Sequence, residues 1–278
     1  MIFLIYVFLL GLLVGSFLNV CIHRWPLDLS IVKPRSRCPK CESPIAWYDN
    51  IPVFSYLWLR GRCRHCRQGI AWHYPVVELS NAVLWLVVAE RTGWQPLSWK
   101  MMLFVSMMIV LIFTDLTEYI LPDEITLGGL AIGLLISPFV LLEPGLSELI
   151  WLFAGARPEP WIVSLVESAF AALMMGGVLF LVSEFYYRVR GREGLGLGDV
   201  KMMAMVGAFW GMQKAFMILL VGSLVGALLG GTLILVRRKE WTHELPYGSY
   251  LGLTAIVAAL FGDDIFRWYA SVVFGAAG

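Results

Sequence analysis

The sequence predicts an all-α polytopic membrane protein with about eight transmembrane helices and one sizeable loop outside the membrane. Two observations predict this class. Hydrophobic residues make up 59% of the 278 residues and charged residues only 15%, whereas globular chains carry ~25% charged residues. The charged residues are also unevenly spread, so that long stretches of the chain carry none and could cross a bilayer.

The same composition excludes several classes of protein. An apolar content this high is incompatible with a disordered chain. Five cysteines are too few for a disulfide-rich module of this length. The formal net charge is +1, so no bulk positive charge is available for nucleic acid, and we expect no nucleic-acid partner. The aromatic content of 14% suits rings at membrane interfaces, and we expect a lipid bilayer around the chain.

A first transmembrane helix is predicted over residues 1–22, which carry no charge. A helix that crosses the ~30 Å hydrocarbon core needs roughly 20 residues. The first basic side chains, His23 and Arg24, follow this apolar run. Because a secretory signal peptide has its basic residues before the apolar run, we expect this helix to remain uncleaved.

Seven further apolar stretches predict the remaining helices. Two of them, 99–114 and 200–213, are short for a membrane span. Glycine pairs within the later stretches predict close packing between helices. No internal repeat is visible. The seven stretches are 76–92, 99–114, 124–142, 161–186, 200–213, 215–236 and 246–266.

The distribution of Lys and Arg predicts the orientation in the membrane. If the loop 23–75 lies in the cytoplasm, sixteen Lys and Arg residues lie on that side and five on the other. Both termini and the loop 143–161 then face outward. We therefore expect three parts, which are a first transmembrane helix over 1–22, a cytoplasmic four-cysteine loop over 23–75 and a transmembrane core over 76–278.

Four of the five cysteines form a metal-binding pattern within the cytoplasmic loop. Cys38 and Cys41 make one C-x₂-C pair, and Cys63 and Cys66 make a second pair after 21 intervening residues. Two such pairs supply the four thiolates of a structural zinc site, and the flanking Arg and Lys residues favour thiolates. Disulfides or redox use of the cysteines are the alternative, although a reducing cytoplasm opposes a pair of disulfides, and a metal-free loop is a third reading. We predict a zinc-stapled loop whose metal is structural, since four thiolates leave no position for a catalytic water.

Two aspartates beside the apolar stretches are the candidate catalytic residues. Asp115 follows the stretch 99–114 and Asp199 precedes the stretch 200–213, so the predicted topology puts both at cytoplasmic ends of helices. Acidic side chains near a bilayer are costly and are therefore functional candidates. Two neighbouring carboxylates can share a proton, and one can then activate water while the other polarises a carbonyl. This pairing predicts the chemistry of an aspartic peptidase, and the glycines before Asp199 would allow close approach of an extended peptide.

Other readings of the acidic residues are weaker. Each aspartate alone could be a solvated cap at a helix end, and only their common depth favours catalysis. Glu78 and Glu167 lie inside apolar stretches, and for them we favour structural hydrogen bonds. The Gly-x-Gly run before Asp199 follows an apolar helix rather than a strand, so it does not predict a dinucleotide site.

Together these residues resemble one known family. Gly196-Leu197-Gly198-Asp199 is similar to the G-x-G-D signature of intramembrane aspartic proteases. With Asp115 and the cysteine loop, the match is to bacterial type IV prepilin peptidases, and it extends over nearly the whole chain. Further segments similar to that family are 15–20, 49–52, 60–63, 74–78, 121–123 and 246–250.

The resemblance implies a function and a set of site residues. The catalytic pair would be Asp115 and Asp199, whereas Asp123 is interpreted as a helix cap. The enzyme would remove the short basic leader from prepilins and pseudopilins at the cytoplasmic face of the bacterial inner membrane. It would then methylate the new N-terminus with S-adenosylmethionine, in support of type IV pili, type II secretion or competence. Thr117 and His73 stand where many members have an acidic residue and an arginine, and neither position belongs to the catalytic pair.

Two other classes of function fit parts of the sequence. A non-enzymatic scaffold could dock an assembly protein on the zinc loop, but it would not need two acids at one depth. A transporter or channel could bind ions with intramembrane acids, which are then expected near the midplane rather than at helix ends. Asp115 and Asp199 therefore favour the peptidase. We expect the methyl donor near the cytoplasmic loop and the ends of the first helices, where the resemblance extends well beyond the aspartates.

Overall fold

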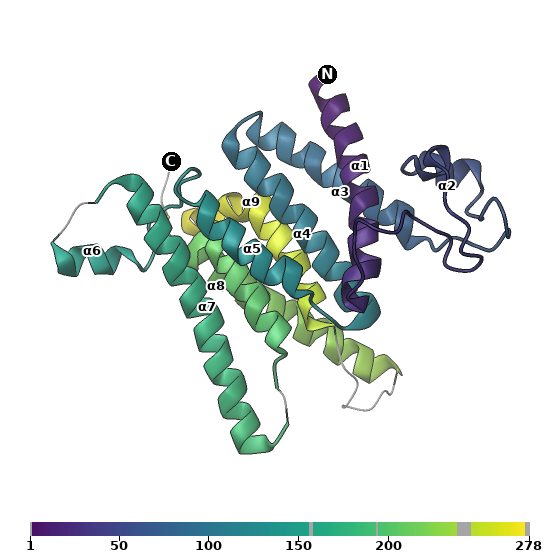
Figure 1. Cartoon of the computed structure of the whole chain (residues 1–278). Helices are drawn as coiled ribbons and strands as arrows, with labels where there is room; N and C mark the ends of the chain where they lie inside the picture. The colour runs from purple at the N-terminus through teal and green to yellow at the C-terminus, as the bar shows by residue number, and fades with distance from the viewer. Residues whose placement is uncertain (1, 156–157, 193, 238–245, 276–278) are drawn as a thin grey trace. The chain divides into compact units, whose positions relative to one another are not determined.

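The computed structural model describes residues 2–155, 158–192, 194–237 and 246–275. Within these ranges the chain is helical, with two isolated β-bridges in its loops. Arg157, Arg238 and Lys239, which the count of basic residues includes, lie outside the described residues. The elements are α1 (Ile2–Arg24), η1 (Trp25–Leu27), η2 (Trp47–Asn50), α2 (Phe54–Trp58), α3 (His73–Thr92), α4 (Pro96–Glu118), α5 (Asp123–Ile136), α6 (Glu148–Ala154), α7 (Pro160–Arg190), α8 (Leu197–Arg237) and α9 (Tyr247–Phe274) (Figure 1).

Five segments of the described chain are long and apolar enough to cross a membrane, so the prediction of an all-α multi-pass membrane protein is confirmed. The exact number of spans, predicted as about eight, stays a prediction. The unpredicted helix α6 lies within the loop 143–161. The five candidate spans are Ile2–Leu27, Pro96–Glu118, Pro160–Arg190, Leu197–Thr232 and Tyr247–Val273.

Helix α5 ends six residues before the predicted stretch 124–142 does. Pro138 has no N–H to donate to the Leu134 carbonyl, so the helical hydrogen bonding is interrupted there. The Ser137 hydroxyl donates to the Leu134 carbonyl instead, at 2.8 Å. A side chain therefore satisfies the carbonyl that the proline leaves without a backbone partner.

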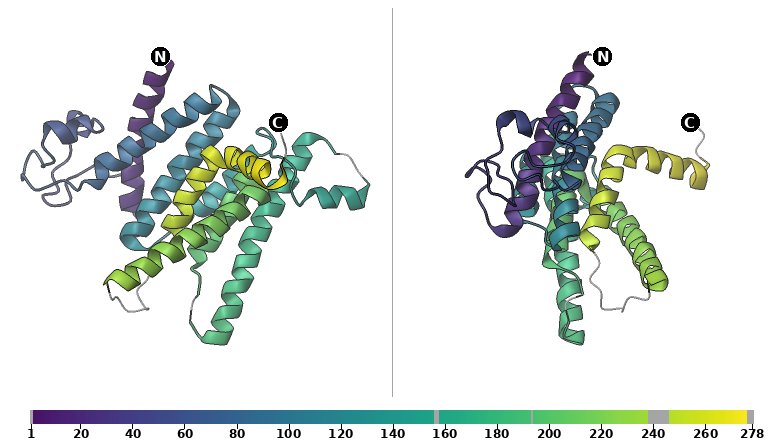
Figure 2. Two further views of the ribbon diagram at one scale, coloured as in Figure 1. Left: turned by 180° about the vertical axis from the view of Figure 1, so that it is seen from behind. Right: turned by 90° about the vertical axis from the view of Figure 1, so that its right-hand side faces the viewer.

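The chain forms two compact units, residues 1–114 and 115–278. Helices α1 and α3 make the main contact of the first unit. In the second unit α8 contacts α5, α7 and α9, and Figure 2 shows α8 and α9 side by side in both views. The two candidate aspartates belong to the second unit and the four cysteines to the first.

Helices α1 and α3 approach each other at backbone distance. A methyl group added at Gly15 would lie 2.6 Å from Glu78 Cα, and one added at Gly11 would lie 2.7 Å from Ala82 Cα. Only glycine permits such an approach, as is usual where apolar helices pack in a membrane. The order of these contacts along the two helices shows that they run antiparallel. Asn81 Nδ2 adds a hydrogen bond to the Gly11 carbonyl at 2.7 Å.

Helix α8 reverses its direction at Gly211, where the backbone is not helical (φ 76°, ψ 176°). The first limb begins with Asp199 close to Gly248, at the start of α9. The second limb returns to the same end of α9, where Gly226 lies against Tyr247. The predicted stretches 200–213 and 215–236 correspond to these two limbs, and the break lies three residues before the boundary predicted at residue 214.

A buried glutamate satisfies the backbone at this break. Glycine adopts the positive φ of residue 211 without steric cost, but the break removes the helical acceptor of the Met212 N–H. Glu167 of α7, 1% exposed, accepts this N–H on Oε1 at 2.9 Å. Its Oε2 accepts the Gly145 N–H at 3.2 Å and the Ser147 hydroxyl. The structural hydrogen bonds favoured for Glu167 are therefore present.

We predict that Glu167→Leu lowers the free energy of unfolding by about 3 kcal/mol, because three donors would lose their acceptor in an apolar environment. Thermal unfolding of the detergent-solubilised protein measures this change. Glu184→Leu on the same helix is the matched control. Glu184 pairs with exposed Arg188, and its replacement should cost little. Equal unfolding temperatures for the two variants would contradict the role assigned to Glu167.

Candidate active site and metal centre

Asp115 is anchored at the first turn of α9. It lies in the last turn of α4, with 6% of its surface exposed. Its Oδ2 accepts the Ser249 N–H at 2.6 Å and the Ser249 hydroxyl at 2.8 Å. The first N–H groups of a helix have no partner within the helix and carry a partial positive charge. Asp115 therefore occupies a position that favours a carboxylate.

Asp199 reaches the same turn of α9 from the start of α8. Its Oδ1 lies 3.2 Å from the point where a Cβ would stand on Gly248, the residue before Ser249. The Gly196 backbone hydrogen-bonds its carboxylate. Asp199 and Asp115 are close enough to interact electrostatically. The two carboxylates that the sequence selects therefore lie together, on adjoining residues of one helix terminus.

Two glycines allow this convergence because Leu121 lies between them. A methyl group at Gly198 would lie 3.0 Å from Leu121 Cβ. A methyl group at Gly248 would lie 2.9 Å from Leu121 Cδ1 and would also crowd Asp199. The second glycine of the Gly-x-Gly-Asp run thus makes room for a neighbouring side chain, so that the starts of α8 and α9 can meet.

One polar residue of this unit, Ser249, was missed from the sequence, and another, Asp123, was misassigned. Ser249 lies in the segment 246–250, which carries the family resemblance but received no role. Asp123 is not a helix cap, because it is the first residue of α5 and makes no capping hydrogen bond. Its carboxylate instead pairs with Lys201 Nζ at 2.7 Å and 2.9 Å. A capping role follows from position alone, whereas this pair depends on the packing of α8 against α5.

Glu78 is not part of the aspartate site. It belongs to the first unit, where it is 7% exposed. Its Oε2 accepts the Val53 N–H at 2.7 Å, and the Ser16 hydroxyl also donates to its carboxylate. The structural hydrogen bonds favoured for Glu78 are therefore present, and they join α3 to α1 and to the cysteine loop.

The four cysteines of the first unit come together as a candidate metal site. The Sγ atoms of Cys38, Cys41, Cys63 and Cys66 all lie within 4.8 Å of one another. Tetrahedral zinc with ~2.3 Å bonds to sulfur separates its sulfur ligands by ~3.8 Å. The Sγ atoms of Cys38 and Cys66 are 3.8 Å apart. The donor set and its spacing therefore fit a four-thiolate metal ion.

The two cysteine pairs stand on the same backbone scaffold. The segments 36–45 and 61–70 share the pattern Arg-Cys-x₂-Cys-x₃-Ile. The loop therefore contains an internal repeat, and the prediction of no repeat is wrong here. The residue after each second cysteine has a positive φ, 56° at Glu42 and 60° at Arg67. Three backbone hydrogen bonds of the first segment recur in the second. The bonds of the first segment are Cys38 N–H to Ser43 O, Glu42 N–H to Cys38 O and Ile45 N–H to Ser36 O. Their counterparts, in the same order, are Cys63 N–H to Gln68 O, Arg67 N–H to Cys63 O and Ile70 N–H to Gly61 O.

The thiols of this cluster differ in acidity. A hydrogen bond from the Ser43 side chain lowers the pKa of the Cys41 thiol to about 6. The backbone around Cys66 and His65 also lowers the pKa of Cys63. The Gln68 backbone lowers the pKa of the Cys66 thiol. Burial and the hydrogen bonds of Cys66 to the neighbouring thiols outweigh this effect and raise its pKa to about 11. Some thiolates would thus be present before a metal binds, and binding would release the remaining protons.

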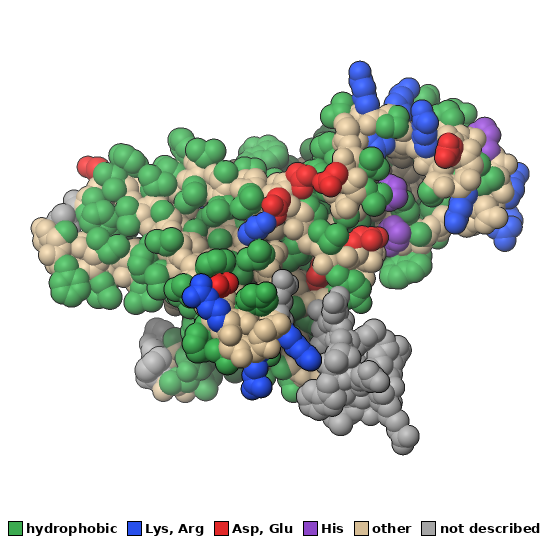
Figure 3. Space-filling view, turned by 60° about the horizontal axis from the view of Figure 1, so that its bottom comes forward, with side chains coloured by type: hydrophobic (Ala, Val, Ile, Leu, Met, Phe, Trp, Pro, Cys, Tyr) green, Lys and Arg blue, Asp and Glu red, His purple; other side chains and the backbone are tan. Residues whose placement is uncertain are grey.

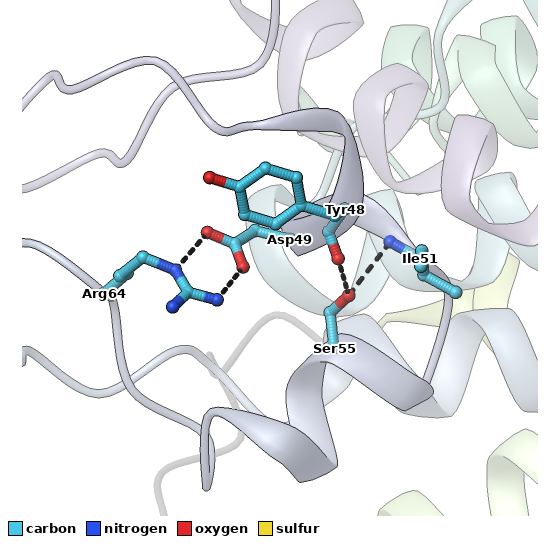
Figure 4. Close-up of polar contacts among 5 residues, drawn as sticks. All are labelled: Tyr48, Asp49, Ile51, Ser55 and Arg64. Atoms are coloured by element: carbon cyan, nitrogen blue, oxygen red, sulfur yellow. Dashed lines mark hydrogen bonds and ion pairs between the residues drawn. The ribbon is translucent and has the colours of Figure 1, made fainter.

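An ion pair fixes the segment before α2 to the second cysteine pair (Figure 4). Arg64 donates from Nε to Asp49 Oδ2 at 2.7 Å and from Nη2 to Asp49 Oδ1 at 2.5 Å. The guanidinium holds the pKa of the Asp49 carboxyl below its usual range. Ser55 continues the network, because its hydroxyl accepts the Ile51 N–H at 3.0 Å and donates to the Tyr48 carbonyl at 2.9 Å.

The surface of the cysteine loop is basic. Residues 23–75 contain nine Lys and Arg residues but only three acidic ones. Figure 3 shows Lys, Arg and His side chains gathered over the surface that this segment forms. Such a surface attracts anionic groups and repels a positively charged peptide.

The fold and this site define a multi-pass helical membrane protein with a paired-carboxylate site and a four-cysteine loop. Comparison with protein families matches residues 9–92 to the bacterial peptidase A24 N-terminal domain and residues 102–231 to the type IV leader peptidase family. The chain belongs to the type IV leader peptidase family. Ser249 lies outside both matched ranges, as does the whole of α9.

Curated relatives cover almost the whole chain. A protein of Aeromonas salmonicida is 36% identical, over 96% of this chain and 94% of its own length. A protein of Aeromonas hydrophila is 37% identical, over 95% and 92%. One of Pseudomonas aeruginosa is 35% identical, over 96% and 93%. All three are named prepilin leader peptidase/N-methyltransferase, and no solved structure matches the chain.

We predict that the purified protein contains about one Zn²⁺ per chain, because one tetrahedral ion uses all four thiolates. Metal analysis of protein never exposed to a chelator measures this. Replacing Cys38 and Cys63 by serine should remove the metal, whereas the matched change Cys21→Ser in α1 should leave it in place. A metal-free wild-type protein would sink the assignment.

Proposed function

We propose that Asp115 and Asp199 are the catalytic pair with which this chain cleaves the leader from prepilins and pseudopilins. The observation that carries this proposal is the convergence of both carboxylates on Gly248 and Ser249, at the first turn of α9. The membership of the type IV leader peptidase family supports the reaction. The activity serves pilus biogenesis or a related secretion or competence system.

The contacts of the two acids support different roles for them. The Ser249 N–H and hydroxyl both stabilise negative charge on Asp115, so we assign Asp115 the role of general base. Asp115 would take a proton from water as the water oxygen bonds to the scissile carbonyl carbon. Asp199 would donate a hydrogen bond to the carbonyl oxygen. When the C–N bond breaks, the leaving amine takes from Asp115 the proton that came from water, and the pair returns to its starting state.

We also propose that the chain methylates the new N-terminus, as the names of its relatives indicate. The neutral α-amine would form a bond to the methyl carbon with its lone pair. The electron pair of the broken C–S bond would stay on sulfur, so S-adenosylmethionine would supply the methyl group and become a neutral thioether. The methylated amine would then release a proton to water. This step needs no acid pair.

The proposed topology keeps the loop 23–75 and both aspartates on the cytoplasmic side of the inner membrane. The bias of Lys and Arg towards that side supports it. We retain the division into a first span (1–22), this loop and a membrane core (76–278). In the loop, Zn²⁺ bound by the four cysteines would be structural, since thiolates fill its coordination sphere.

The geometry favours a peptidase over the two alternative functions. A scaffold does not require two carboxylates at one helix terminus, where Asp115 is bound by Ser249, 134 residues further along the chain. An ion pathway would place its acids in the middle of a span, whereas Asp115 lies in the last turn of α4 and Asp199 in the first turn of α8.

We predict that Asp115→Asn and Asp199→Asn each abolish leader cleavage, because an amide can neither act as a general base nor cycle a proton. Cleavage of a purified prepilin by the reconstituted enzyme measures this. Asp123→Asn, which changes an exposed acid paired with Lys201, is the control and should still cleave. Full cleavage by either of the first two variants would remove that residue from the pair.

We predict that Ser249→Ala lowers kcat for leader cleavage about tenfold, through the loss of one hydrogen bond to a charged group, with little change in KM. Ser249→Thr keeps the hydroxyl and should restore most of kcat. Ser164→Ala is the structural control, because within the described part of the chain this buried serine of the same unit bonds to backbone, at Leu142 and Ser137. An unchanged kcat for Ser249→Ala would show that the backbone N–H alone holds Asp115.

A further inference from the structure

The first unit contains a cavity that the peptidase reaction does not use. Its volume is about 420 Å³, within the ~300–1,000 Å³ that small-molecule sites typically have. The C-terminal end of α1, the N-terminal end of α3 and the cysteine loop form its walls. We propose that this cavity binds the methyl donor, S-adenosylmethionine, with Asn19 and Glu78 as its polar anchors. The inference rests on the proposed methylation and gives that activity a site.

Within the described part of the chain, the buried side chain of Asn19 has one unsatisfied polar atom, its Oδ1. It lines the cavity and is 5% exposed. Its Nδ2 donates to the Tyr74 carbonyl at 3.0 Å, which fixes the orientation of the amide. Its Oδ1 has no hydrogen-bond partner among the described residues. Because a buried acceptor without a donor is costly, a donor from a bound molecule is the natural complement.

A second part of the cavity lining, at Val53, is held in a strained conformation. Val53 has φ 60° and ψ −48°, a γ-turn geometry that is unfavourable for a β-branched residue. The bond from its N–H to Glu78 Oε2 stabilises this conformation and leaves the Glu78 carboxylate in the cavity wall. Strained backbone held by a buried side chain is typical of ligand-binding sites.

The chemistry of the cavity matches the methyl donor better than a basic leader peptide. The donor offers adenine, ribose and ammonium N–H or O–H groups to Asn19, and its sulfonium would lie favourably near Glu78. Its carboxylate would suit the basic wall, where Arg37 and Lys40 are also found. A basic leader would meet four Lys and Arg residues against two acidic ones in this wall, which disfavours it.

Equilibrium binding of S-adenosylmethionine to the full-length purified enzyme, measured by calorimetry, tests the proposal without relying on turnover. Asn19→Ala should weaken binding about tenfold, which is the effect of losing one hydrogen bond in a buried site. Val20→Phe, which fills the cavity from α1 and leaves Asn19 in place, should remove measurable binding. Photolabelling with the methyl donor should mark peptides that carry residues 16–24 or 47–56.

Asn81→Ala is the matched control for Asn19→Ala. Asn81 also joins α1 and α3 through its amide, but the Ser106 hydroxyl satisfies its Oδ1 and it does not line the cavity. Asn81→Ala should lower the unfolding temperature as much as Asn19→Ala does. It should leave the affinity for the methyl donor unchanged.

The outcomes separate this proposal from the proposed function. If the wild-type enzyme neither binds nor uses the methyl donor, the methyltransferase function itself fails. If the wild-type enzyme binds it, but Asn19→Ala and Val20→Phe bind equally well, the cavity is the wrong site and the function stands. Photolabel confined to residues 115–278 would likewise overturn the assignment. Should Asn19→Ala fail to fold, Val20→Phe and the photolabel decide between these results.

Discussion

The demand that every backbone group in an apolar environment find a partner shapes the second unit of this protein. Helix α8 can reverse at Gly211 only because side chains of α7 satisfy the groups that the break exposes. Glu167 accepts the Met212 N–H, and the Ser168 hydroxyl donates to the Ala208 carbonyl at 2.7 Å. The reversal returns the second limb of α8 to the end of α9 at which the first limb begins. At the start of α9, a first-turn N–H also finds a side-chain partner, because the Asp115 carboxylate accepts the Ser249 N–H.

Two glycines allow the aspartate site to form within this arrangement of helices. Gly198 and Gly248 accept Leu121 between them, which brings the beginnings of α8 and α9 within reach of each other. The Gly-x-Gly-Asp run therefore has a steric function as well as any role in admitting a peptide. In the first unit Gly11 and Gly15 have a comparable function, since they let α1 approach α3 closely enough for Asn19 to reach the Tyr74 carbonyl.

Features that depend on local sequence were predictable, and features that depend on packing were not. The apolar runs, the four cysteines and both aspartates follow from composition and spacing. Ser249 could not be assigned, because its partner Asp115 is 134 residues away and only the folded chain brings them together. The break at Gly211 was misplaced by three residues, since its position depends on Glu167 of another helix. The repeat formed by the segments 36–45 and 61–70, the two cysteine knuckles, was missed because the shared pattern Arg-Cys-x₂-Cys-x₃-Ile leaves most positions free.

The position of the proposed zinc site implies a consequence for the cell. Cys38 and Cys63, one from each knuckle, form part of the wall of the cavity beside Asn19 and Glu78. The internal hydrogen bonds of each knuckle do not need a metal, so zinc would act by joining the two knuckles rather than by folding either one. A cell short of zinc would then lose the shape of this wall while the aspartate pair, built wholly from the other unit, kept its geometry. With the zinc site and the methyl-donor site as proposed, zinc starvation would therefore yield pilins that are cut but unmethylated.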